Sequence, residues 1–225
     1  MNNKNLNLDY DTVFDMIYNY GPKLRYDLSR NKFDVYETEY KNNVKDEKIR
    51  MQVYQKHFGN AVPSKSAVEE LSKYIGKEPV LELDAHLGLW ASLLRWTGTK
   101  ITSTESHGSK YNAFYPIEHI NYTDALDKYN DATTLLMVCH KDSFISRRID
   151  EILDSFKGDR IVFICEKKHM DQLSKRKITG TLDNVMSRLK NKKNTSWMII
   201  NEIELPHWLN HHSKIYMLEK IKLQQ

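Results

Sequence analysis

Cysteine, long apolar runs and low-complexity linkers are scarce or missing in this chain of 225 residues. Its two cysteines, Cys139 and Cys165, are too few for a disulfide-stapled secreted scaffold and are typical of a reducing compartment. No apolar run approaches the roughly 20 residues that span a bilayer, and the first ten residues lack the apolar stretch of a secretory signal. We therefore expect an intracellular, soluble protein, cytoplasmic or alternatively nuclear, with no membrane partner.

Enough apolar material is present for a sizeable core, because 40% of the residues are hydrophobic and 11% are aromatic. The net charge of +4 is uneven: residues 141–225 carry 17 basic and 11 acidic groups. A basic patch of this kind either attracts a polyanion or is a solvated face. The candidate polyanion-binding residues are Lys167, Lys168, Lys175, Arg176, Lys177, Lys190, Lys192 and Lys193.

Helix and strand signals alternate from Pro63 onward. Ser66 and Glu69 have the spacing of a capping box, which predicts a helix that ends at Gly76. The last two strand-like segments have too few residues between them for a parallel crossover, so they should pair antiparallel. The predicted strands cover residues 80–84, 101–105, 133–139, 160–165, 197–205 and 214–221.

The order of these elements predicts an α/β protein, with a Rossmann-like three-layer αβα sandwich and a mostly parallel sheet that closes in a C-terminal antiparallel strand. We assign residues 58–225 to this domain and residues 1–57 to a helical N-terminal extension. In the extension, Val13, Phe14, Ile17 and Tyr18 share one helical face, with Asp9 or Asp11 as the cap.

Residues 80–105 resemble the first strand, loop and second strand of class I S-adenosylmethionine-dependent methyltransferases. Residues 58–63, 88–95 and 197–221 look like a group of small methyltransferase-like proteins. In the family's loop, Glu-x-Gly-x-Gly-x-Gly, the glycines tolerate positive φ and let the backbone approach the methionine part of the cofactor. An acid at the end of the second strand holds the ribose hydroxyls.

Two of the family's glycines are replaced in this loop. Glu82 and Gly88 match the pattern, whereas Asp84 and His86 stand at the first two glycine positions. Glu105 matches the ribose-binding acid. The resemblance therefore implies a cofactor-binding set of Glu82, Asp84, His86, Gly88 and Glu105 if the site is functional, and the substitutions predict that it is degraded.

A second departure lies at the end of the strand at residues 133–139. Amino-methylating enzymes of this fold carry an Asp/Asn-Pro-Pro-Tyr type of motif there, and this chain has Cys139-His140-Lys141-Asp142-Ser143. His140 or Asp142 could act as a general base, or both could be ordinary loop residues. We find no confident catalytic residue.

Our leading hypothesis is a methyltransferase-like protein that no longer methylates, needs no cofactor, and binds or scaffolds a protein or nucleic-acid partner. The alternative is an active S-adenosylmethionine-dependent methyltransferase acting on a nucleic acid, a protein or a small molecule. His207 and His211 could present two imidazoles to a metal, but no further ligands complete a site, so we expect no metal.

Overall fold

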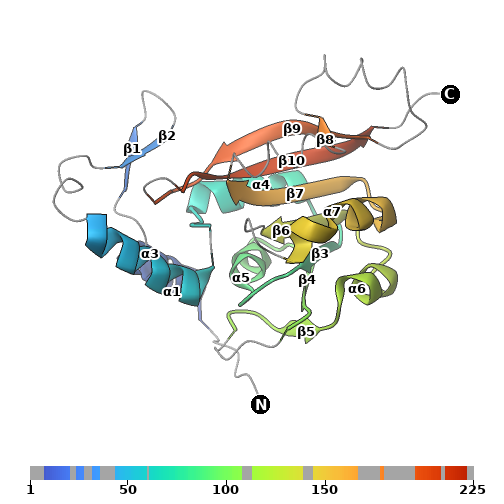
Figure 1. Cartoon of the computed structure of the whole chain (residues 1–225), viewed down its shortest axis with the longest axis horizontal. Helices are drawn as coiled ribbons and strands as arrows, with labels where there is room; N and C mark the ends of the chain where they lie inside the picture. Colours follow the sequence, from blue (N-terminus) through green and yellow to red (C-terminus); the bar gives the residue numbers. More distant parts are fainter. Residues whose placement is uncertain are drawn as a thin grey trace.

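The computed structural model describes residues 8–20, 24–27, 32–35, 44–59, 61–107, 113–138, 144–166, 178–179, 196–208 and 211–221. A central sheet of eight strands has helices on both faces (Figure 1). Its strands are β3 (Val80–Leu83), β4 (Ile101–Glu105), β5 (Ile117–His119), β6 (Thr134–Val138), β7 (Arg160–Glu166), β8 (Ile178–Thr179), β9 (Ser196–Glu204) and β10 (Ser213–Ile221).

The strand order across the sheet is β5-β4-β3-β6-β7-β10-β9-β8. The chain moves outward from β3 through β4 to β5 and then returns to the other side of β3 to form β6, which makes a topological switch point beside β3. β10 is antiparallel to both β7 and β9, whereas the other described pairs of this sheet are parallel. The predicted α/β fold class, with its antiparallel C-terminal strand, is confirmed.

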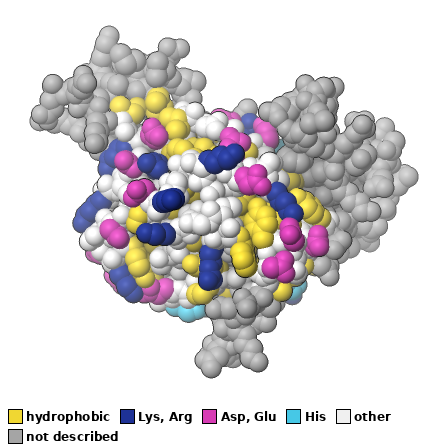
Figure 2. Space-filling model, turned by 180° about the vertical axis from the view of Figure 1, so that it is seen from behind, with side chains coloured by type: hydrophobic (Ala, Val, Ile, Leu, Met, Phe, Trp, Pro, Cys, Tyr) yellow, Lys and Arg dark blue, Asp and Glu magenta, His cyan; other side chains and the backbone are white. Residues whose placement is uncertain are grey.

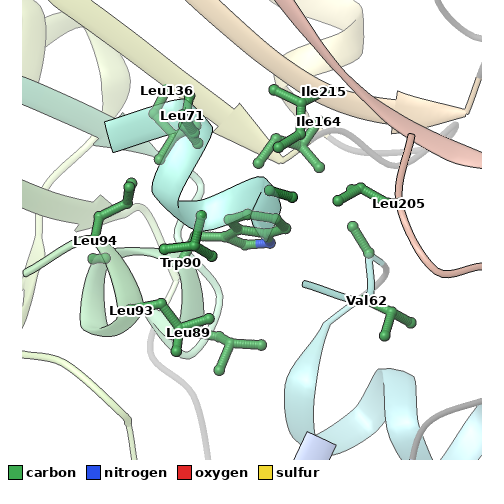
Figure 3. Packing of buried hydrophobic residues seen from close by; sticks show 14 of the residues in the cluster. Val62, Leu71, Leu89, Trp90, Leu93, Leu94, Leu136, Ile164, Leu205 and Ile215 are labelled. Atoms are coloured by element: carbon green, nitrogen blue, oxygen red, sulfur yellow. The ribbon is translucent and has the colours of Figure 1, made fainter. Parts of the chain in front are cut away.

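Two hydrophobic cores lie on opposite faces of the sheet because its buried strands alternate their side chains. The first core packs α4 (Lys65–Ile75) and α5 (Leu89–Trp96) onto Val80 and Leu136. The second packs α6 (Tyr122–Lys128) and α7 (Phe144–Ser155) onto Leu81. Figure 3 shows part of the first core, with Trp90 among helix residues such as Leu71 and Leu94 and with Leu205, which follows β9, nearby.

The start of α4 differs from the prediction. Its N-cap is Ser64, whose side-chain oxygen accepts a hydrogen bond from the Ala67 N–H at 3.2 Å. The helix therefore begins one residue before Ser66, so the predicted capping box at Ser66 is wrong. The predicted end is confirmed, since Gly76 takes a φ of 73° and donates its N–H to the Ser72 carbonyl.

The N-terminal region contains α1 (Tyr10–Tyr20), a hairpin of β1 (Leu24–Asp27) and β2 (Lys32–Val35), and α3 (Val44–Phe58). Asp9 accepts the Thr12 N–H at 2.9 Å and so caps α1. Val13, Phe14 and Ile17 are buried in the first core. Tyr18 is 54% exposed, and its ring lies 5.8 Å from the ring of Phe14, so the predicted shared face is confirmed with Tyr18 at its edge. The boundary after residue 57 stays a prediction. No described helix is long and apolar enough to cross a bilayer.

Candidate functional site at the carboxyl ends of β3 and β4

The residues of the predicted cofactor loop lie where β3 and β4 end side by side. The two strands are parallel, with Glu82 opposite Ser103, and the loop from Asp84 to Gly88 joins β3 to α5. A shallow pocket, open to solvent and with room for about one water molecule, lies at this edge. It is lined by Leu83, Asp84, Thr104, Glu105, Ser106, Ile120 and Tyr122.

The loop backbone is left-handed at three alternate positions. The φ angles of Asp84, His86 and Gly88 are 59°, 55° and 69°, and the first two are the only positive values for non-glycine residues in the described chain. An L-residue in this region costs roughly 1–2 kcal/mol, somewhat less for Asp. The loop thus keeps, at a cost in strain, a backbone course that glycine would adopt freely.

Packing explains why Gly88 is a glycine. A Cβ there would lie 2.9 Å from the Tyr115 Cβ, which is closer than side chains tolerate. The same segment is tied to the loop by a hydrogen bond of 2.8 Å from the Phe114 N–H to the Leu87 carbonyl. The fold therefore requires Gly88 whether or not a ligand binds.

The Glu105 carboxyl is turned toward the protein's own loop. Its Oε2 accepts the His86 N–H at 3.0 Å and its Oε1 accepts the His107 N–H at 3.3 Å. Burial and, after it, the neighbouring Asp84 carboxyl together raise the pKa of Glu105 to about 7, against the lowering effect of the two backbone hydrogen bonds. Both oxygens of the acid expected on a ribose are thus already hydrogen-bonded within the protein.

Glu82 lies deeper on the same face of the sheet. It is fully buried, its Oε2 accepts the Ser103 hydroxyl at 2.6 Å, and its Oε1 has no hydrogen-bond partner in the structure. Burial, reinforced by the charges of Glu105 and Asp84 and opposed by the Ser103 hydrogen bond, raises the pKa of Glu82 to about 8. We call Glu82, Asp84 and Glu105 the carboxyl cluster.

No protein-family model and no curated protein matches the chain. Three solved structures resemble it. An NADB-Rossmann superfamily protein from Streptococcus agalactiae is 10% identical, with 73% of this chain and 72% of that chain covered and a TM-score of 0.47. An uncharacterized protein from Listeria monocytogenes serotype 4b is 12% identical (72% of this chain, 70% of that chain, TM-score 0.49), and the 23S rRNA methyltransferase ErmE is 11% identical (72% of each chain, TM-score 0.44).

The strand order establishes the fold. The parallel strands β5, β4, β3, β6 and β7 contain a topological switch point beside β3, and the antiparallel strand β10 lies between β7 and β9. The chain has a class I methyltransferase-like fold. In this fold the first strand corresponds to β3, and the end of the second corresponds to Glu105. The methyltransferase-like loop and its acid therefore lie together, as the resemblance implies.

Other candidate residues fall outside the described chain. These are His140 and Asp142, together with Cys139, Lys167, Lys168, Lys175, Arg176, Lys177, Lys190, Lys192 and Lys193. On the face drawn in Figure 2, the described basic and acidic side chains are interspersed and form no patch of one sign. Cys165 packs in the second core, where burial raises the pKa of its thiol.

The histidines before β10 pair differently from the spacing that suggested a metal. The rings of His207 and His212 lie 4.0 Å apart, whereas His211 places its Nδ1 2.7 Å from the Glu166 Oε1. The described residues contain no group of three side chains that could hold a metal ion. The sequence analysis missed the His211–Glu166 pair, although Glu166 ends β7 and Ser213, which begins β10, lies opposite it.

Proposed function

We propose that this methyltransferase-like protein does not use S-adenosylmethionine and acts as a binding module. The burial and the hydrogen bonds of the Glu105 carboxyl carry the proposal. Its side chain is part of a residue only 9% exposed, and both carboxyl oxygens accept hydrogen bonds from the loop backbone. Ribose hydroxyls would have to compete with these bonds for a carboxyl whose raised pKa reduces its charge at neutral pH.

The side chains at the two replaced glycines support the same conclusion. Asp84 lines the pocket and would place a carboxylate close to the carboxylate of the cofactor's methionine part. His86 adds an imidazole, exposed to solvent, to a turn that the family keeps free of side chains. The residues present therefore fit the cofactor poorly.

Calorimetric titration with S-adenosylmethionine and S-adenosylhomocysteine tests the proposal. We expect no saturable heat for the natural chain at about millimolar ligand. The double variant Asp84→Gly/His86→Gly removes both side chains and the backbone strain, so any binding gained by it would identify these two residues as the obstacle. Micromolar binding by the natural chain would overturn the proposal.

The left-handed course of the loop favours a second candidate, an active methyltransferase. In that case Gly88 would allow close approach of the cofactor and Glu105 would turn outward to the ribose. Glu105→Ala should then abolish cofactor binding and methyl transfer from labelled donor, while Glu118→Ala, which changes a half-buried acid on β5 outside the pocket lining, should leave both unchanged. An equal effect of the two variants would reject this candidate.

We further propose that the binding partner is a protein or a nucleic acid and that the basic residues after β7 contribute to it. Because phosphate contacts release counterions, nucleic-acid affinity should fall steeply with salt. Reversing the charge of Lys190, Lys192 and Lys193 should flatten this dependence. An unaltered slope would exclude these three lysines from the contact.

A further inference from the structure

Four buried aromatic rings join α3 to the carboxyl end of the central sheet. On α3, the Tyr54 and Phe58 rings lie one helical turn apart and stack with their centroids 4.9 Å apart. The Tyr54 ring meets Trp208 edge to face at 5.5 Å, and the Phe58 ring stacks on Phe114 at 5.6 Å. None of the four side chains is more than 7% exposed, so α3 is held to the sheet by rings that are packed out of solvent.

The two contacts of α3 lie on either side of β6. Trp208 precedes β10, and its carbonyl accepts the N–H of His211, whose ring pairs with Glu166 at the end of β7. Phe114 is hydrogen-bonded to Leu87 in the loop after β3. Because β6 lies between β3 and β7, α3 crosses the carboxyl end of β6. Figure 1 shows α3 to the left of the sheet, on the side where β9 ends. Ligands of open α/β sheets enter at this edge, at the switch point.

Two polar groups are left unpaired where α3 meets the sheet. The Tyr54 hydroxyl and the Trp208 Nε1 are both buried and have no hydrogen-bond partner. Folded proteins pair most buried polar groups, because an unpaired group forfeits the hydrogen bonds that it makes with water. Both groups belong to one ring contact, so both would regain hydrogen bonds with water if α3 moved away. The contact is therefore weakened at the place where the helix would separate from the sheet.

The chain leaves α3 through a glycine that can act as a hinge. Gly59 donates its N–H to the Gln55 carbonyl at 3.1 Å and takes a φ of 91°, and nothing lies within 4 Å of the place of a Cβ. Shortly after it, Ala61 and Val62 are buried in the first core and anchor the chain. A residue with a free backbone between a helix and an anchored segment can absorb the rotation of that helix.

We propose that α3 is a lid, which turns about Gly59 and in this structure closes the carboxyl end of β6. In the closed position Tyr54 and Phe58 cover Trp208 and Phe114, and opening uncovers these two rings. The hydrogen bonds that the Tyr54 hydroxyl and the Trp208 Nε1 then make with water offset part of the cost of exposing apolar surface. The inference goes beyond the proposed function, because it concerns access to this edge of the sheet and not the identity of what binds there.

Native-state hydrogen exchange, followed residue by residue by NMR at several urea concentrations, tests the lid. We expect the α3 amides to exchange through an opening that is more frequent and less dependent on urea than the global unfolding that exposes the β7 amides. Tyr54→Phe keeps the ring and removes the unpaired hydroxyl, so it should slow the exchange of α3 by roughly fivefold or more.

Tyr74→Phe is the matched control, because it removes a hydroxyl that donates to the Leu218 carbonyl at 3.0 Å. It should speed the exchange of β7 and leave that of α3 unchanged. Exchange of α3 that follows β7 in rate and urea dependence would overturn the inference, since the helix would then open only by global unfolding. Exchange of α3 that Tyr54→Phe does not slow would overturn it as well. Neither result bears on the proposed function, which is tested by titration with S-adenosylmethionine.

Discussion

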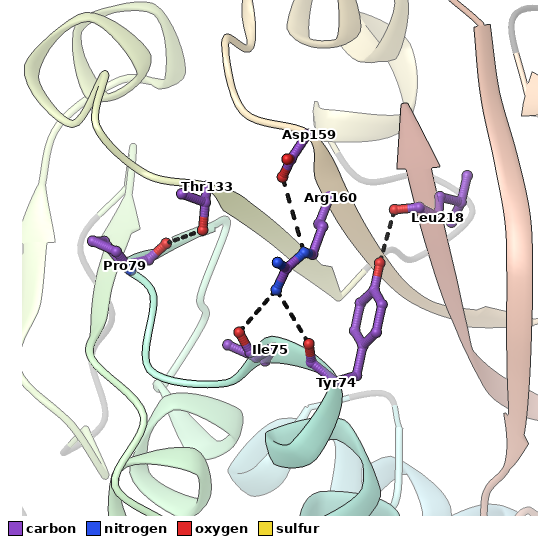
Figure 4. A network of polar contacts seen from close by, with 7 residues as sticks. All are labelled: Tyr74, Ile75, Pro79, Thr133, Asp159, Arg160 and Leu218. Atoms are coloured by element: carbon purple, nitrogen blue, oxygen red, sulfur yellow. Dashed lines mark hydrogen bonds and ion pairs between the residues drawn. The ribbon is translucent and has the colours of Figure 1, made fainter. Parts of the chain in front are cut away.

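The two ends of the central sheet differ sharply in how their polar groups are satisfied. At the amino end, Arg160 at the start of β7 donates to the Tyr74 and Ile75 carbonyls at 3.2 and 3.0 Å (Figure 4). The Tyr74 hydroxyl donates to the Leu218 carbonyl at 3.0 Å. A cation thus meets the last turn of α4, where the helix dipole and free carbonyls favour it.

The carboxyl end of the same strands has the opposite character. Three carboxyl groups lie together, one buried oxygen has no partner, and two residues without the freedom of glycine take positive φ. Such costs persist only where the surrounding structure enforces them, and they gather at functional sites. The contrast indicates that the polar groups at the amino end stabilise the domain, whereas those at the carboxyl end lower its stability, which accords with the binding role proposed above.

The largest effect that we expect is on the pH dependence of the unfolding free energy, and it tests the contrast between the two ends of the sheet. The folded pKa values of Glu82 and Glu105, about 8 and 7, exceed their ordinary value of 4.5, so the folded state binds more protons than the unfolded state between these limits. The free energy of unfolding should therefore be highest below about pH 4.5 as far as these groups are concerned, and fall by several kcal/mol by about pH 8. Urea unfolding across this range measures it.

Glu82→Gln provides the check, because a glutamine keeps the size and the Ser103 hydrogen bond but does not titrate. The loss of stability toward pH 8 should become much smaller in this variant. Glu118→Gln serves as the matched control, since Glu118 is an acid whose pKa is lowered by Lys128 and which titrates below this range. Identical pH slopes in the natural chain and the Glu82 variant would contradict the prediction.

Next in size is Gly88→Ala, which tests whether packing enforces the loop. The new Cβ would meet Tyr115 at 2.9 Å and would take a φ of 69°. We expect about 3 kcal/mol of destabilisation by urea unfolding, from strain and overpacking together. Gly98→Ala has a comparable φ of 88° but no atom within 4 Å, so strain alone should cost it about 1 kcal/mol. Equal losses would mean that Tyr115 moves aside freely.

At the amino end, Arg160→Met should destabilise the protein by about 2 kcal/mol, because two helix carbonyls lose a charged donor while the aliphatic stem is kept. Arg148→Met removes an exposed ion pair with Glu151 on α7 and should change stability by less than about 0.5 kcal/mol. A thermal unfolding experiment on both variants measures the difference. Similar losses of stability in the two variants would contradict the stabilising role of the Arg160 contacts at the amino end.

Much of the fold could be predicted because strong signals were local. Continuous apolar runs marked β6 and β7, and the short link between β9 and β10 required antiparallel pairing. Weak signals failed: β5 has only three residues, Ile117–His119, and it was not predicted. The cap of α4 was misplaced because Ser64 and Ser66 are both good caps, and backbone geometry selects between them.

The position of the candidate site could be predicted from the sequence, but the hydrogen bonding of its side chains could not. Spacing placed Glu105 at the end of β4 beside the loop, yet it could not say that the backbone of His86 and His107 would bind both carboxyl oxygens. The His211–Glu166 pair joins residues 45 positions apart through the register of β10 and β7, which no local pattern encodes. Long-range register and side-chain direction are properties of the folded chain.

The smallest predicted effect isolates the like-charge contact at the carboxyl end. Asp84→Asn keeps a side chain that tolerates positive φ, but it removes the charge that raises the pKa of Glu105. We expect a gain of about 1 kcal/mol in unfolding free energy at pH 8 and almost none at pH 5, where protonated Glu105 no longer repels Asp84. Asp127→Asn on the exposed face of α6 controls for net charge. A gain in unfolding free energy that does not depend on pH would attribute the destabilising effect of Asp84 to its backbone conformation and not to its charge. Repulsion between carboxyl groups would then not contribute to the difference between the two ends of the sheet.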